Sequence, residues 1–252
     1  RDMAGIPRKG MPNYPGRINE MYKHYMLNGR SRSQALLQVK NDIAFLLGTE
    51  IDHAAVIRFA AFDAMMDELG PIRVNNPRAI KDPKLIDSGN PVGVYFPAAK
   101  SWVLVGSPTS QYPRCSGWWW HSPAQTWRSG YDCHRALMYA RTRKGKANSD
   151  FKRQRRGVDI VMAGITKALS NKSALGGLVS AANSQNSNNF MSTLPMTATN
   201  AQQLYGVLSG SVLAKRIVFK PPTYGTKIRG SAKYRINVSR VRTWVNNNFD
   251  NI

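Results

Sequence analysis

The alternation of helical and strand patterns between residues 34 and 74 constrains the fold of this chain most strongly. The first helical stripe consists of Val39, Ile43, Leu46 and Leu47. Residues 54–58 then fit a buried strand, residues 62–69 a second helix, and residues 72–74 a second strand. Because helices and strands in this order pack as a sheet covered by helices, the pattern predicts an α/β fold.

Capping residues and apolar stripes extend this interpretation along the chain. Ser33 fits the N-cap of the first helix, and Gly48 fits the position after its last turn. Residues 92–96 and 102–105 predict a hairpin. Further helices are predicted over residues 136–141, 150–169 and 200–208 and from Ser239 onward, and a strand over 216–219. The helix over 150–169 has an apolar stripe made of Val158, Val161, Met162, Ile165 and Leu169.

Polar stretches predict the connections. Residues 1–30, 75–91, 106–130 and 182–190 are expected to be loops, and the third of these contains Trp118–Trp120. The sequence shows no internal repeat and no domain boundary, so a single domain over residues 1–252 is expected.

The composition restricts the class of protein and of partner. Hydrophobic residues make up 42% of the chain, which is enough for a core and excludes wholesale disorder. Lys and Arg number 36 and Asp and Glu 14, which gives a formal net charge of +22. A chain this basic is expected to meet an anionic partner, namely nucleic acid, anionic lipid or a phosphorylated substrate.

The positive charge is concentrated between two predicted helices. This basic cluster consists of Arg135, Arg141, Arg143, Lys144, Lys146, Lys152, Arg153, Arg155 and Arg156. Arg141 and Arg143 can point at one target only if the chain leaves the helix there, and Arg153 lies near the start of the next helix. Three guanidinium groups at a helix N-terminus would form a pyrophosphate clamp. The alternative is a solvated basic face.

The sequence gives little support for a metal site, a nucleotide-binding loop or a catalytic nucleophile. The four histidines lack metal-ligand spacing, and nucleotide-binding glycine motifs and a nucleophile elbow are absent from the sequence. Cys115 and Cys133 do not form a zinc motif. Taken alone, these two cysteines could equally be a disulfide or two separate thiols.

Several ordered segments resemble the LytR–CpsA–Psr family of bacterial cell-wall glycopolymer transferases. Asp132–Lys144 resembles the family's D-G-x-x-A-L-x-Y-x-R-x-R run, and Asp150–Arg156 resembles its D-x-x-R-x-x-R-Q run, with Gly157 in place of Gln. Upstream, the resemblance continues in Ile51–Phe62, Asp67–Gly70, Arg17-Ile18-Asn19 and Arg1-Asp2. The likeness runs in order from residue 1 to about residue 170.

The resemblance implies a three-layer α/β/α fold with a central mixed sheet and an apolar lipid pocket. It implies a phosphotransferase that moves a glycopolymer from a polyprenyl pyrophosphate carrier to peptidoglycan or a surface glycoprotein, with a pyrophosphatase side activity. It also implies a monomer at the surface of a Gram-positive-type bacterium, outside the cytoplasmic membrane and without a nucleic-acid partner. In that location a Cys115–Cys133 disulfide becomes the expected state.

Site residues are carried over from the matching motifs. The resemblance assigns pyrophosphate binding and catalysis to Arg1, Arg141, Arg143, Asp150 and Arg153, and further substrate contacts to Arg17, Asn19 and Arg156. It implies Mg²⁺, with the metal-binding aspartates, the first strands and a membrane anchor expected upstream of residue 1. Two other functions remain open, namely a nucleic-acid-binding protein and a non-enzymatic module that binds anionic polymer.

Overall fold

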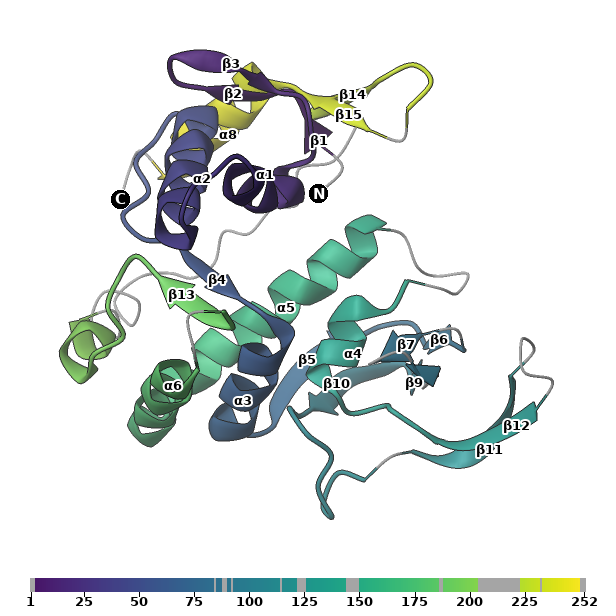
Figure 1. Cartoon of the computed structure of the whole chain (residues 1–252). Coiled ribbons are helices and arrows are strands. Elements are labelled where there is room, and N and C mark those ends of the chain that lie inside the picture. The colour runs from purple at the N-terminus through teal and green to yellow at the C-terminus, as the bar shows by residue number, and fades with distance from the viewer. Residues whose placement is uncertain are drawn as a thin grey trace. The chain divides into compact units, whose positions relative to one another are not determined.

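The computed structural model describes residues 3–83, 85–87, 90–91, 93–113, 115–121, 126–143, 150–185, 188–203, 223–231 and 233–249. These residues group into two compact units. Unit 1 combines residues 1–56, 191–195 and 214–252, and unit 2 combines residues 57–190 and 196–213. The prediction of one domain stays a prediction, and the two units are described in turn (Figure 1).

Unit 1 contains strands and helices from both ends of the chain. Its elements from the first part of the chain are β1 (Met3–Ala4), β2 (Ile6–Arg8), β3 (Met11–Tyr14), η1 (Ile18–Glu20), α1 (Met21–Leu27) and α2 (Arg32–Leu47). From the last part come β14 (Gly225–Lys227), β15 (Tyr234–Ile236) and α8 (Val238–Phe249). Strand β15 pairs in parallel with β1 and antiparallel with β14, so this three-stranded sheet is mixed. The two ends of the sequence therefore fold together.

The core of unit 1 lies between α1, α2, α8 and the β2–β3 hairpin. Its buried residues are Ile6, Tyr14, Met21, Tyr25, Ala35, Leu46, Ile236 and Val241. Gly48 follows α2 with φ 76°, as the sequence predicts. The N-cap is Ser31 rather than Ser33, because the Gln34 side chain accepts from the Ser31 amide while the Ser31 hydroxyl accepts from the Gln34 amide. The loop prediction for residues 1–30 is wrong, since these residues form β1–β3 and α1.

Two of the passages of the chain between the units run along short strands. Strand β4 (Ala55–Ile57) leads into unit 2, β13 (Phe190–Ser192) leads back, and the two strands pair. On the unit 1 side, the Thr193 amide donates to the Ala54 carbonyl at 2.9 Å. On the unit 2 side, the Arg58 amide donates to the Asn189 carbonyl at 2.8 Å.

Unit 2 contains short strand ladders and several helices. The strands are β5 (Ile72–Asn76), β6 (Ile80–Asp82), β7 (Ile86–Asp87), β8 (Asn90–Pro91), β9 (Val94–Phe96) and β10 (Ala99–Leu104). Strand β5 pairs with β10, β6 with β9, and β7 with β8, all antiparallel. The predicted hairpin of 92–96 with 102–105 is therefore wrong, because each of these segments pairs with a strand earlier in the chain. The predicted 75–91 loop likewise contains β6, β7 and β8.

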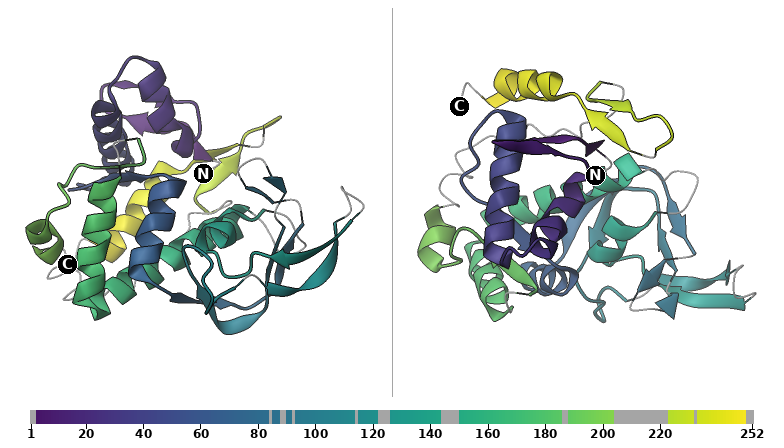
Figure 2. Two further views of the ribbon diagram at one scale, coloured as in Figure 1. Left: turned by 60° about the horizontal axis from the view of Figure 1, so that its bottom comes forward. Right: turned by 45° about the horizontal axis from the view of Figure 1, so that its top comes forward.

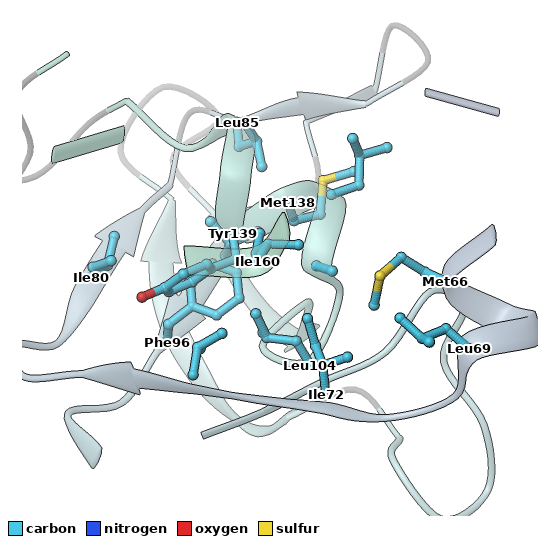
Figure 3. Close-up of a cluster of buried hydrophobic side chains, with 14 of the residues drawn as sticks. Met66, Leu69, Ile72, Ile80, Leu85, Phe96, Leu104, Met138, Tyr139 and Ile160 are labelled. Carbon is cyan, nitrogen blue, oxygen red and sulfur yellow. The ribbon is translucent and has the colours of Figure 1, made fainter. Parts of the chain in front are cut away.

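Helices cover these strands and close the core of unit 2. They are α3 (Phe59–Leu69), α4 (Ala136–Arg141), α5 (Asp150–Ser170) and α6 (Lys172–Ser184), and α3 packs against α6 (Figure 2). Figure 3 shows the core, where the rings of Phe96 and Tyr139 meet edge to face with centroids 5.0 Å apart. The sequence missed α6, whose last turns occupy the start of the predicted 182–190 loop.

The predicted loop over residues 106–130 contains an antiparallel hairpin. Strands β11 (Cys115–His121) and β12 (Thr126–Tyr131) pair with Trp120 opposite Trp127. Cys115 and Cys133 form a disulfide with Cα atoms 5.8 Å apart, as expected from the resemblance. The disulfide joins the start of this hairpin to the segment before α4. Residues 198–203 are helical, which confirms the start of the predicted 200–208 helix. Residues 204–222, which include the rest of that helix and all of the 216–219 strand, lie outside the described residues.

The buried face of α5 differs from its predicted apolar stripe. Val161 is 56% exposed, whereas Ile160 is 2% exposed and Ala168 is buried. Arg156 lies on this buried face, one turn before Ile160. The stripe predicted from the larger apolar residues therefore missed the inward face of α5. That face contains an arginine and a small residue, Ala168, in addition to Ile160.

Secondary structure and packing together confirm the mixed α/β class. The lipid pocket implied by the resemblance stays a prediction. Among the described residues, no helix combines the length and apolar character needed to cross a membrane.

Candidate anion-binding site at the end of α4

Four arginines of the basic cluster, Arg141, Arg143, Arg153 and Arg156, lie at or near the point where α4 ends, whereas Arg135 precedes α4 and pairs with Asp63. Thr142 has φ −54° and ψ 134°, so the chain leaves the helix directly after Arg141. This is the condition under which Arg141 and Arg143 can serve one target. Thr142 is completely buried, while Arg141 is half-buried and Arg143 is exposed. We call residues Arg141–Arg143 the α4 exit, and its two arginines flank an inward-facing threonine.

The Arg141 guanidinium is held by two neighbours in unit 2. Its Nη2 donates to the Ile86 carbonyl at 2.9 Å. Its central carbon lies 4.9 Å from the ring centre of Phe59, which is a cation–π contact. Since Phe59 is 58% exposed, Arg141 lies beside an apolar surface at the edge of the protein.

A buried carboxylate supports the other side of the α4 exit. Asp82, at the end of β6, is 1% exposed. Its Oδ2 accepts from the Thr142 hydroxyl at 2.8 Å and from the Arg143 amide at 2.9 Å. Residues 75–91 were predicted to be a polar connection, and no signal in the sequence singled Asp82 out.

Arg156 reaches the α4 exit from α5. Its Nε donates to the Tyr139 carbonyl at 2.9 Å, and its Nη2 donates to the Thr142 carbonyl at 2.7 Å. The Tyr139 carbonyl belongs to the last turn of α4, whose carbonyls lack intrahelical partners, and the Thr142 carbonyl directly follows the helix. Burial lowers the pKa of Arg156, while the nearby charge of Asp82 acts in the opposite direction.

Arg153 lies one helical turn before Arg156 in the first turn of α5. Residues three apart share a helix face, so Arg153 lies on the same side as Arg156 and near the α4 exit. Its positive charge is close enough to lower the pKa of Arg156, although by less than burial does. Asp150 is the first residue of α5. Anions are favoured at this helix end because its first amides are free and the helix dipole is positive there.

Tyr139 anchors α4 in the core beneath the site. Its hydroxyl donates to Asn76 Oδ1 at 3.3 Å, and the Asn76 amide donates to the Pro97 carbonyl at 2.6 Å. Burial raises the pKa of Tyr139 to about 12, so the phenol stays neutral and keeps its proton for Asn76.

The remaining site residues predicted from the resemblance belong to unit 1. Arg17 is the residue before η1, where its Nη1 lies 3.7 Å from Glu20 Oε1, and Asn19 is exposed within η1. Arg1 lies outside the described residues. Arg141, Arg143, Arg153 and Arg156 are thus brought together within unit 2, and the predicted roles of Arg1, Arg17 and Asn19 stay predictions.

The described residues offer a poor fit for Mg²⁺. Their one cluster of three potential ligands consists of Cys115, Cys133 and His134, and both sulfur atoms are in the disulfide. Because Mg²⁺ prefers oxygen ligands in octahedral geometry, this set does not suit it. The metal implied by the resemblance therefore takes no part in the mechanism derived below.

Comparison with solved structures confirms the fold. The chain is similar to B. subtilis TagV, with 21% identity and a TM-score of 0.60 over 99% of this chain and 81% of that one. It is also similar to B. subtilis TagU, with 19% identity and a TM-score of 0.58 over 98% and 80%. A structure titled a transcriptional regulator, from Enterococcus faecalis, matches with 16% identity and a TM-score of 0.60 over 98% and 74%. No curated protein matches the sequence.

The fold and the α4 exit together define an α/β protein with several arginines gathered at the end of α4. The sequence model of the LytR_cpsA_psr family matches residues 2–244, and the chain belongs to this family. Members of the family are cell-surface proteins that generally transfer cell-wall glycopolymers to peptidoglycan.

Proposed function

We propose that this protein transfers a glycopolymer from a polyprenyl pyrophosphate carrier to a hydroxyl group of peptidoglycan or of a surface glycoprotein. The observation that carries the proposal is the α4 exit, where Arg141 and Arg143 flank a buried residue beside the first turn of α5. Family membership supplies the reaction class. A membrane anchor and a pyrophosphatase side activity belong to the same proposal, and so does Mg²⁺, held by residues other than those described above.

The proposed reaction is a phosphoryl transfer. The acceptor oxygen forms a bond to the sugar-proximal phosphorus, the bridging P–O bond breaks, and polyprenyl phosphate leaves. The acceptor proton passes to the leaving phosphate or to water. Such a reaction depends on positioning and on neutralising charge more than on a protein nucleophile, which suits a site rich in arginine.

Arginine side chains would bind and orient the pyrophosphate. Arg141, Arg143 and Arg153 can each donate a bidentate pair of hydrogen bonds to phosphate oxygens. Arg1, Arg17, Asn19 and Asp150 complete the set assigned by the resemblance. The exposed ring of Phe59 beside Arg141 offers an apolar neighbour to the first isoprene units of the carrier.

The test replaces Arg141, Arg143 or Arg153 with Ala and measures transfer of a labelled lipid-linked glycan to peptidoglycan. Each contact is worth about 1.5–3 kcal/mol, so each variant is expected to be roughly ten- to a hundredfold slower or worse. Replacement of Arg143 with Lys should restore activity only in part, because Lys keeps the charge but lacks the planar fork.

Arg155 provides the matched control. It belongs to the same basic cluster and the same helix, it is exposed, and residues two apart point to opposite faces of a helix. Arg155→Ala should therefore retain most of the transfer activity. Equal losses for Arg153→Ala and Arg155→Ala would instead favour a diffuse basic surface that binds anionic polymer or nucleic acid. Thermal melts of all variants check that the fold is intact.

A further inference from the structure

Two buried charged side chains meet at Thr142. Asp82 accepts from its hydroxyl, and Arg156 donates to its carbonyl. Asp82 also accepts from the amide of the next residue, Arg143. One carboxylate and one guanidinium therefore fix the side chain, the carbonyl and the following amide at the residue where the helix becomes extended.

Core packing alone does not explain this arrangement. Burial of a carboxylate and a guanidinium carries a desolvation cost, and apolar residues of similar volume often stabilise a core equally well. Asp82 and Arg156 are 1% and 6% exposed. The described hydrogen bonds of Asp82, and the one that Arg156 Nη2 donates, are made at the α4 exit, where a small backbone rotation would redirect Arg141 and Arg143.

We infer that Asp82, acting through Thr142 and together with Arg156, is a positioning residue that sets the direction of Arg141 and Arg143 toward the pyrophosphate. The inference rests on the proposed function and deepens it. A misplacement of about 1 Å can cost a hundredfold in rate, so support of this kind has a large effect without touching the substrate. The direct substrate contact assigned to Arg156 by the resemblance is a separate prediction that awaits its own test.

The experiment measures binding of farnesyl pyrophosphate, a soluble short-chain probe, to the full chain by calorimetry. Asp82→Asn keeps the size of the side chain but removes its charge and one acceptor oxygen. Thr142→Val removes only the hydroxyl donor, and Thr142→Ser restores it. Tyr139→Phe is the matched control, because it removes only the buried hydrogen bond from the hydroxyl to Asn76 and keeps both the ring and the carbonyl that contact Arg156.

We expect Asp82→Asn and Thr142→Val to weaken binding by about tenfold or more, and Thr142→Ser and Tyr139→Phe by less than about threefold. The Arg143 backbone amide should exchange with solvent faster in Asp82→Asn, because it loses its acceptor. In addition, Arg143→Ala should weaken binding by a smaller factor in the Asp82→Asn background than in the wild type. An arginine that no longer points toward the pyrophosphate contributes less to the affinity, so its removal has a smaller effect.

Two different results would overturn the inference, and they are distinguishable. If Arg143→Ala weakens binding by the same factor in both backgrounds, Asp82 is merely structural while the arginine clamp stands. The same conclusion follows if Asp82→Asn binds as tightly as Tyr139→Phe. If Arg141→Ala and Arg143→Ala both bind the probe as the wild type does, the clamp itself is wrong, and Asp82 has no arginines to position.

Discussion

At the scale of single residues, charged side chains that are neighbours in the sequence differ in how far they are buried. Arg153, Arg155 and Arg156 are near neighbours on α5, yet Arg155 is exposed while Arg156 donates to carbonyls of α4. The motif predicted a substrate contact for Arg156, and its hydrogen bonds show in addition that it holds the backbone at the end of α4. Asp82 could not be predicted, because a single acid in a polar stretch looks like any surface residue.

A pH-dependent stability is expected from Tyr139. Its pKa is about 12 in the folded protein and about 10 in an unfolded chain. The neutral phenol therefore contributes stability that is fully present below about pH 10 and is lost as the pH rises from about 10 to about 12. Urea unfolding across this range should show a smaller fall in stability for Tyr139→Phe. Identical pH profiles would contradict the assignment of this proton to the buried hydrogen bond.

At the scale of elements, local sequence determined helix ends better than strand partners. Gly48 after α2 and the break after Arg141 were both predicted from local signals. The partners of β9 and β10 were not, since hydrophobic alternation marks a strand without saying which other strand it joins. The β11–β12 hairpin was missed because the Ser, Pro and Gly residues of 106–130 favour turns, and they were given more weight than the strand preference of Trp118–Trp120.

The disulfide should stabilise this hairpin region measurably. Cys115 and Cys133 are separated by 18 residues, and closing a loop of this size is worth about 3 kcal/mol in the chain-entropy model. Mass spectrometry of the oxidised protein should therefore find no free thiol, and reduction should lower the melting temperature. The double variant Cys115→Ser/Cys133→Ser should melt like the reduced protein and should not respond to reductant. Two free thiols under oxidising conditions would refute the bond.

At the scale of the whole molecule, a net charge of +22 predicts a second, non-specific kind of binding. Attraction of anionic polymers by many exposed charges should weaken steeply with salt, because the Debye length is about 10 Å at 0.1 M. Retention on a negatively charged cation-exchange resin should therefore fall with rising salt concentration to the same extent in Arg143→Ala and Arg155→Ala. Binding of farnesyl pyrophosphate should instead distinguish these two variants. A failure to distinguish them would favour the polymer-binding alternative.

The mixed α/β class, the family and the motifs around the α4 exit follow from periodicity and motif spacing, because these are local properties of the chain. The folded structure was needed to show that residues 3–14 lie in one unit with the last strands and that β6 places Asp82 within hydrogen-bond distance of Thr142. It also shows that Arg156 faces inward. These features join segments far apart in the chain, and their energy comes from burial and hydrogen bonds that exist only after the segments have met.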